Sequence, residues 1–395
     1  SEYISAHSLK AGYNLLSFSV LPEDQSLNLV IPGTGSDSPI LGIIGEGVAA
    51  SYIHTDSWGD NLYGWFGSLV YLSPNSGYWV QCTQDNILII QGNKNTNSNF
   101  ELHTGSNLIS YKCSTPGAID QLIPPNCIEG ILGQGVATSY INGWGWIGSL
   151  TELFPGSGYW FKVKNDCGNI TLSYDCPEEP PALTRMAENN INSPQFTQST
   201  LQAFYFVESI DNAEDGDIIE AYNGTTLVGS RVWQGSYTDI PVMGDDKSEF
   251  TKDFCTTGST PVFKLIKKNG ITFDITGNIP AWESNGLLIV ESLDIIELTP
   301  NTYSLASVYP NPFNPSTTVS FTLPELSVVT MVVFDITGRE ITKLVNGTME
   351  AGYHNLTWNA DSQSSGIYFM KMVARSSIGD VNREFIQTQK LILAK

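Results

Sequence analysis

The chain has 395 residues, 41% of them hydrophobic, and a formal net charge of -21. This length predicts two to four domains that each bury a core of their own. Residues 300–395 hold seven basic and seven acidic residues, so the excess negative charge lies in the first 299 residues. Such a charge argues against a nucleic-acid partner, and the absence of any run of eighteen apolar residues argues against a transmembrane segment.

Two copies of one β-rich module are predicted at residues 1–100 and 101–177. In the first copy Leu16, Phe18 and Val20 alternate with serine, which is the period of a strand buried on one face. Glycine, asparagine, proline and serine separate such segments and predict tight turns, and a short helix is predicted at 116–123. The matched segments of the two copies are 14–18 with 107–111, 45–53 with 133–141, 64–69 with 145–150, and 76–79 with 157–160.

Proline and glutamate at 178–191 predict a stiff, solvated linker after the second copy. The next module, at 192–298, contains five strand candidates separated by turn residues, and this pattern predicts a β-sandwich. The strand candidates are 203–207, 217–222, 226–233, 262–266 and 286–290.

The last module, at 303–395, has the pattern of short strands joined by tight turns. Val319, Phe321 and Leu323 alternate with polar residues, and Gly338 supplies a turn position where a positive φ is tolerated. Four or more such strands in about ninety residues predict a small sandwich. The sequence therefore predicts an all-β fold of four small β-sandwich or β-rich modules in tandem.

This last module resembles the type A C-terminal sorting domain of substrates of the type IX secretion system, found in Bacteroidetes and related phyla. A proline-asparagine box, an aspartate-x-threonine-glycine-arginine turn, a serine-glycine-isoleucine-tyrosine strand and a basic end occur in the family's order. The residues that carry the resemblance are Pro310, Asn311, Pro312, Gly338, Arg339, Gly366, Lys390 and Lys395. The resemblance implies an Ig-like sandwich, the type IX machinery as a partner, and a secreted or cell-surface location. It leaves open whether the domain is later cleaved. The two repeats also look like the glycine- and tryptophan-rich units that often precede such domains.

Six cysteines are present, and their spacing does not suit a zinc site. In an oxidising compartment the sequence-local pairs Cys113–Cys127 and Cys167–Cys176 are predicted, each closing a loop worth about 3 kcal/mol. Cys82 and Cys255 remain, and the sequence leaves open whether they pair, stay free or link subunits.

Catalytic motifs are poorly represented, so the sequence predicts a protein that is not an enzyme and has no cofactor. The four histidines lack metal-ligand spacing, and the Gly-x-Gly-x-x-Gly match at 143–148 lacks a surrounding strand-loop-helix unit. Calcium is the one metal for which a case exists, because hard oxygen ligands on loops suit it. Its candidate ligands are Asp211, Glu214, Asp215 and Asp217. The alternative is solvated turn residues that hydrogen-bond locally.

Three aromatic residues near a length-variable loop, Trp58, Tyr63 and Trp144, are candidates for ligand or subunit contact. The preferred hypothesis is a non-enzymatic structural or adhesive protein, with self-assembly into an extracellular fibre or layer as one version. A carbohydrate-binding protein that stacks exposed tryptophans on a polysaccharide is the alternative, and an extracellular hydrolase is the third.

Overall fold

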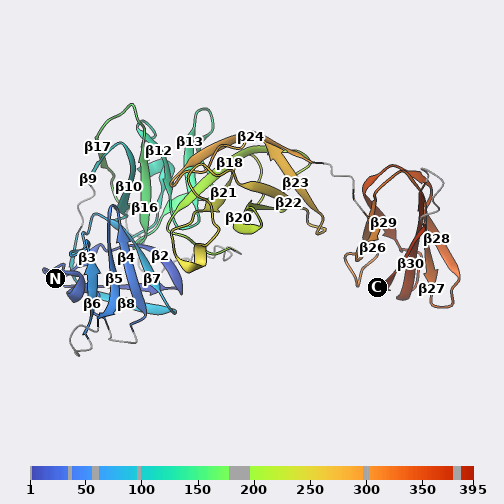
Figure 1. The fold of residues 1–395 in the computed structure, drawn as a ribbon, viewed down its shortest axis with the longest axis horizontal. Helices are drawn as coiled ribbons and strands as arrows, with labels where there is room; N and C mark the ends of the chain where they lie inside the picture. The colour runs from blue at the N-terminus through green and yellow to red at the C-terminus, as the bar shows by residue number, and fades with distance from the viewer. Residues whose placement is uncertain are drawn as a thin grey trace. The chain divides into compact units, whose positions relative to one another are not determined.

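The computed structural model describes residues 2–33, 38–55, 62–95, 99–177, 196–296, 300, 302–376 and 384–395. The chain divides into two compact units, Ser1–Ile295 and Ile296–Lys395 (Figure 1). Strands dominate both units, which confirms the all-β prediction, and the α-helices are the single turns α1 (Leu27–Val30) and α2 (Ile119–Leu122) among the described residues. No helix in these ranges has the length and apolar character needed to cross a bilayer. The predicted linker at 178–191 lies outside the described residues.

The first copy, hereafter repeat 1, places its core between two sheets. Phe18, Ile43 and Val80 are fully buried there. One sheet has the order β2-β7-β4-β5-β6 and the other β1-β8-β3. Their bounds are β1 Tyr3–Leu9, β2 Gly12–Ser17, β3 Val20–Leu21, β4 Ile40–Gly45, β5 Val48–Thr55, β6 Leu62–Gly67, β7 Gly77–Cys82 and β8 Asn86–Lys94.

The second copy, repeat 2, has a five-stranded sheet of matching order, β10-β16-β12-β13-β14, and two-stranded sheets β17-β9 and β11-β15. Strand β9 begins just before the predicted boundary at residue 100, and α2 lies inside the predicted helix. The bounds are β9 Asn99–Leu102, β10 Gly105–Ser110, β11 Gly117–Ala118, β12 Ile128–Leu132, β13 Ala137–Ile141, β14 Gly145–Ile147, β15 Glu152–Leu153, β16 Gly158–Val163 and β17 Ile170–Ser173.

The two repeats contact each other through equivalent residues. The backbone N–H of Ser17 donates to the Gly156 carbonyl at 2.9 Å, and that of Ser110, the residue matched to Ser17, donates to the Asn75 carbonyl at 3.0 Å. Asn75 is in turn the residue matched to Gly156. This reciprocity is that of an isologous interface, so the two repeats are related by a pseudo-twofold axis.

The centre of this interface requires small residues and buries large ones. A Cβ added at Gly77 would lie 3.1 Å from the Cα of Gly158, which is the glycine matched to Gly77 in repeat 2. Leu15, Trp79 and Leu108 form a separate buried cluster beside these glycines. A side chain at either glycine would push the two sheets apart, so the repeated Ser-Gly-Tyr-Trp segment is explained by packing between the repeats.

The third module buries its core inside one hydrogen-bonded sheet of seven strands, in the order β20-β19-β22-β23-β24-β18-β21. Strands β18 and β24 run parallel and side by side (Figure 1). The module therefore has one sheet in place of the two sheets of the predicted sandwich. The two end strands of this sheet approach each other, so the sheet curls around its core: a Cβ at Gly229 in β20 would lie 1.6 Å from the Pro241 carbonyl in β21. The bounds are β18 Gln202–Ile210, β19 Ile218–Asn223, β20 Thr226–Val232, β21 Thr238–Met243, β22 Val262–Ile266, β23 Thr272–Gly277 and β24 Leu287–Ile295, with a 3-10 turn at Glu249–Thr251.

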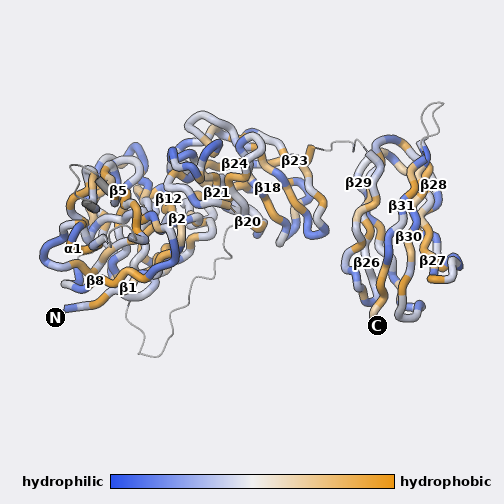
Figure 2. The backbone as a smooth tube through the Cα atoms, turned by 60° about the horizontal axis from the view of Figure 1, so that its bottom comes forward, coloured by the Kyte–Doolittle hydropathy of each residue, from blue (hydrophilic) through white to orange (hydrophobic). Residues whose placement is uncertain are grey.

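The second unit is a two-sheet domain with orders β25-β26-β29 and β28-β27-β30-β31. Hydrophobic and hydrophilic residues alternate along its strands in Figure 2, as a sheet with one buried face requires. Val319, Phe321 and Leu323 are buried between the sheets, as predicted. The bounds are β25 Ser304–Leu305, β26 Ser316–Leu323, β27 Ser327–Asp335, β28 Glu340–Met349, β29 Gly352–Asn359, β30 Gly366–Ser376 and β31 Glu384–Leu393.

Candidate functional sites

The proline-asparagine box and the basic end of the chain lie together in the second unit. The Asn311 side chain donates to the Lys390 carbonyl at 2.9 Å and accepts from the Ile392 N–H at 2.8 Å. Phe313, which is 2% exposed, donates its N–H to the Ile392 carbonyl and accepts from the N–H of Ala394, the residue before Lys395. Two motifs about eighty residues apart in sequence therefore form one surface, with the box held along the last strand.

The turn between β27 and β28 is built around one carboxylate. Asp335 accepts hydrogen bonds from the Thr337 hydroxyl at 2.6 Å and N–H at 2.9 Å, and from the Arg339 N–H and Nε at 3.1 Å each. Gly338 occupies the position with φ +82°, which a side chain would strain. The aspartate-x-threonine-glycine-arginine motif is thus a self-contained turn.

We expect the second unit to lose stability as the pH falls from about 4 to about 2. Hydrogen bonds, chiefly from the Thr337 hydroxyl, lower the pKa of Asp335 from 3.8 to about 2. Because the folded pKa is depressed, the stabilisation is complete above the unfolded pKa and is lost as the pH falls through the folded one. A carboxyl titration by NMR measures it, and Asp335→Asn should remove this part of the pH dependence. A titration midpoint near 4 would contradict the expectation.

The disulfides of repeat 2 join the four predicted cysteines in a different pairing. Cys113 bonds to Cys176 and Cys127 bonds to Cys167, so the predicted sequence-local pairs are wrong. For Cys127–Cys167 the reason is strand register: Ile128 of β12 pairs with Val163 of β16, which brings Cys127 close to the segment after Val163. Cys82 and Cys255 are buried and free.

The predicted calcium loop is organised around a lysine. Asp217 is 1% exposed and accepts from Lys267 Nζ at 2.7 Å, from the Glu214 N–H at 2.8 Å and from the Lys268 N–H at 3.1 Å. Lys267 also lies 3.4 Å from a Glu214 carboxylate oxygen. Burial opposes ionisation of Asp217, but these donors lower the pKa of its carboxyl overall.

The remaining two candidates in this loop, Asp211 and Asp215, are exposed, and the described residues contain no group of three potential ligands arranged to hold a metal ion. Asp217 thus forms an ion pair with Lys267, and calcium binding by this loop stays an untested prediction.

Trp144, one of the three aromatic candidates, is 58% exposed. It lies in the turn between β13 and β14 and meets Tyr237 of the third module edge-on, with ring centroids 5.4 Å apart. Tyr63 in β6 is 38% exposed. Trp58 lies outside the described residues.

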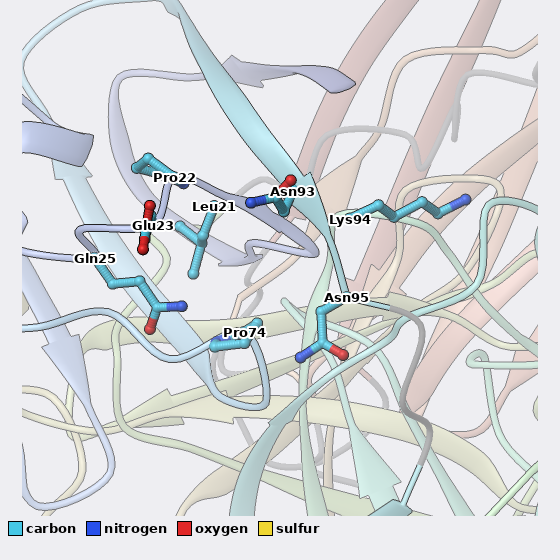
Figure 3. Close-up of a pocket in the computed structure, with 8 residues that line it drawn as sticks. All are labelled: Leu21, Pro22, Glu23, Gln25, Pro74, Asn93, Lys94 and Asn95. Atoms are coloured by element: carbon cyan, nitrogen blue, oxygen red, sulfur yellow. The ribbon is translucent and has the colours of Figure 1, made fainter. Parts of the chain in front are cut away.

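A shallow hollow of about 410 Å³ in repeat 1 was not anticipated from the sequence. Figure 3 shows Leu21, Pro22, Glu23 and Gln25 around it, with the Lys94 side chain directed away from them. Its lining contains a single carboxylate, Glu23. Hydrolysis by a pair of carboxylates needs a second acidic side chain, and this lining does not contain one.

A cluster around an ion pair of the third module also contacts repeat 2, and sequence patterns gave no sign of it. The Asp239 carboxylate accepts from the Ser149 N–H at 2.9 Å, from the Ser149 hydroxyl at 2.6 Å and from the Arg231 guanidinium at 3.2 Å. Burial raises the pKa of Asp239, while Arg231 and Ser149 oppose that shift. Arg231 also donates to the Gly135 carbonyl at 2.8 Å, so one cluster fixes both modules.

The chain is thus an all-β protein whose final unit holds a proline-asparagine box against a basic C-terminal strand. Residues 307–386 match the family described as "Secretion system C-terminal sorting domain". The chain therefore carries a type IX secretion sorting domain, which indicates a secreted or cell-surface protein and names the secretion machinery as a partner. No curated protein matches the chain.

Solved structures show distant similarity. Dimeric latent PorU from Porphyromonas gingivalis is 10% identical, covers 79% of this chain and 36% of its own, and has a TM-score of 0.20. A tetra-tandem repeat in the extending region of a large adhesion protein is 12% identical over 95% of this chain and 93% of its own, with a TM-score of 0.18. The Bacillus anthracis TIE protein is 11% identical over 99% of this chain and 72% of its own, with a TM-score of 0.14.

Proposed function

We propose that this protein is a non-enzymatic structural or adhesive protein of the cell exterior. The observation that carries the proposal is the way the first unit is built: its modules bury their polar contacts against one another, through the Asp239–Arg231–Ser149 cluster and the reciprocal contacts of the two repeats. Such packing suits a load-bearing or display role, because satisfied polar contacts between modules make the unit rigid. The acidic first 299 residues favour solubility outside the cell.

Self-assembly into a fibre or layer is the version of this proposal with the clearest test. We expect purified full-length protein to associate as its concentration rises, and electron microscopy and light scattering would detect this. Monodisperse monomers at high concentration, with no attachment of coated beads to cells or to surfaces, would contradict the proposal. Activity in a broad hydrolase screen that is lost on replacing one carboxylate would also overturn it.

Carbohydrate binding is the second candidate, favoured by the exposure of Trp144. An indole that is 58% exposed and held edge-on by Tyr237 presents a flat apolar face on which a sugar ring could stack. The expected result on a glycan array is saturable binding that Trp144→Ala reduces at least about tenfold, a loss of roughly 1.4 kcal/mol.

Tyr71→Ala is the matched control for the glycan experiment, because Tyr71 is 65% exposed and lies in repeat 1. Equal binding by the Trp144→Ala variant and the unaltered chain would remove this candidate.

A further inference from the structure

The surface of repeat 2 that receives the third module has a defined chemistry. Leu132 and Ala137 are fully buried against Phe204, Phe206 and Leu287 of the third module. The fit is close: a Cβ at Gly130 would lie 2.3 Å from a methyl carbon of Leu287.

Polar contacts frame this apolar centre. Ser149 binds Asp239, and Arg231 donates to the Gly135 carbonyl. The Gln202 side chain donates to the Gly133 carbonyl at 2.8 Å and accepts from the Gly135 N–H at 3.3 Å. The glycines of the β12–β13 turn therefore serve as hydrogen-bonding partners, in addition to their turn role.

Repeat 1 carries the same constellation at its matched positions. The residues matched to Gly130, Leu132, Gly133, Gly135, Ala137, Ile141, Ile147 and Ser149 are Gly42, Ile44, Gly45, Gly47, Ala49, Ile53, Phe66 and Ser68. Six of the eight are identical, the other two are apolar in both repeats, and none is charged. We call these eight residues of repeat 1 the matched surface.

The matched surface is largely open to solvent in the described chain: Gly42 and Gly45 are buried and Ile44 is half-buried, whereas its other five residues are exposed. Ile53 is 44% exposed, Phe66 is 47% exposed and Ala49 is exposed, whereas Ala137 is 0% exposed in repeat 2. The Ser68 hydroxyl lies 3.1 Å from the N–H of Ala49 in its own sheet, whereas that of Ser149 binds the third module.

Packing within repeat 1 does not require a glycine at Gly42, the residue matched to Gly130. A Cβ at Gly42 would meet only ordinary contacts, the nearest at 3.4 Å from the Gln81 side chain. Exposed isoleucine and phenylalanine beside such a glycine form an apolar surface of the kind that marks an interaction site.

We propose that the matched surface of repeat 1 is a second docking site, and that its occupant is a β domain on another polypeptide with the docking chemistry of the third module. That chemistry is a pair of aromatic side chains at alternating positions of one strand, as in Phe204 and Phe206, with an aspartate for Ser68 and an arginine for the Gly47 carbonyl. Each chain has two such surfaces but only one third module. Exchange of third modules between copies of this chain would therefore leave half of the surfaces without an occupant, so we assign the occupant to another polypeptide. This inference concerns a contact surface and holds independently of the adhesive role.

The test uses the full chain with a second copy of residues 192–298 inserted before the tail. The nineteen core residues of the third module all come from that module, so the inserted copy has a complete core. Ser68→Cys in repeat 1 and Asp239→Cys in the inserted copy are treated with a short bismaleimide, and the products are identified by mass spectrometry. We expect cross-linking within or between chains, which Phe66→Asp reduces at least about tenfold by placing a charge in the contact.

Two controls are matched to this design. Ser149→Cys with Asp239→Cys in the original module reports the existing contact with the same aspartate replaced. Ile89→Asp alters a residue of β8 that is 65% exposed and lies outside the matched surface, so it should leave the cross-link unchanged. Cross-linking of the control pair without the Ser68→Cys product, or a product insensitive to Phe66→Asp, would overturn the proposal. Self-association of the unaltered chain through Phe66 without that product would overturn it as well.

Discussion

Replacing Cys113 and Cys176 by alanine is expected to lower the free energy of unfolding of repeat 2 by about 4 kcal/mol. The bond closes a sequence separation of 63 residues, and on the chain-entropy estimate a cross-link of that span restricts the unfolded chain by about this amount. The Cys127–Cys167 bond, with a separation of 40, has a similar expected value. Tyr111 and Tyr174, each two residues before one of these cysteines, stack with ring centroids 5.9 Å apart and hold the same two segments together.

Denaturant unfolding followed by tryptophan fluorescence measures this effect. The unaltered protein under reducing conditions should lose more stability than the double variant, because reduction also opens the Cys127–Cys167 bond. Repeat 1 contains no disulfide among its described residues, and its Cys82 is buried and free, so it supplies an internal reference. An unchanged midpoint for repeat 2 after replacement of Cys113 and Cys176 would contradict the expectation.

The repeats and the tail were predictable because their signals are local. Alternation in 319–323 is set by residues that neighbour one another in one strand, and identical segments such as 76–79 and 157–160 are visible without a structure. All five strand candidates of the third module overlap observed strands, whereas β21 and β23 were missed. In β21 all residues are buried, so no alternation is present.

Contacts between distant segments could not be predicted in this way. The Cys127–Cys167 pairing follows from the register of β12 on β16, and sequence spacing contains no information on that register. The Asp239 cluster draws on residues near 149, 231 and 239, which resemble ordinary surface residues until the modules meet. The calcium prediction omitted Lys267, which lies fifty positions after Asp217 and forms an ion pair with the Asp217 carboxylate.

His7 makes repeat 1 sensitive to acid, and this is the second large effect that we expect. Its ring is 6% exposed, meets Phe18 edge-on at 5.2 Å and lies 3.0 Å from the Ser5 hydroxyl through Nε2. Burial lowers the pKa of His7 from 6.5 to about 4, because the charged imidazolium loses its hydration there. The unfolded chain therefore binds the proton more readily between these two values, and stability falls as the pH drops from 6.5 towards 4. The loss at pH 5 should be about 2 kcal/mol.

His7→Phe is the variant that isolates this effect, since Phe100 occupies the matched position in repeat 2 and is itself 3% exposed. We expect the variant to differ little from the unaltered chain at pH 7 and to keep its stability at pH 5, as measured by urea unfolding at both pH values. His103→Gln is the control. His103 is exposed, and hydrogen bonds to the Thr104 carbonyl and to Glu46 raise its pKa, so protonation of His103 stabilises the folded chain where protonation of His7 destabilises it. The His103→Gln variant should therefore still lose stability at pH 5. The same loss of stability in His7→Phe as in the unaltered chain would assign the acid sensitivity to another group.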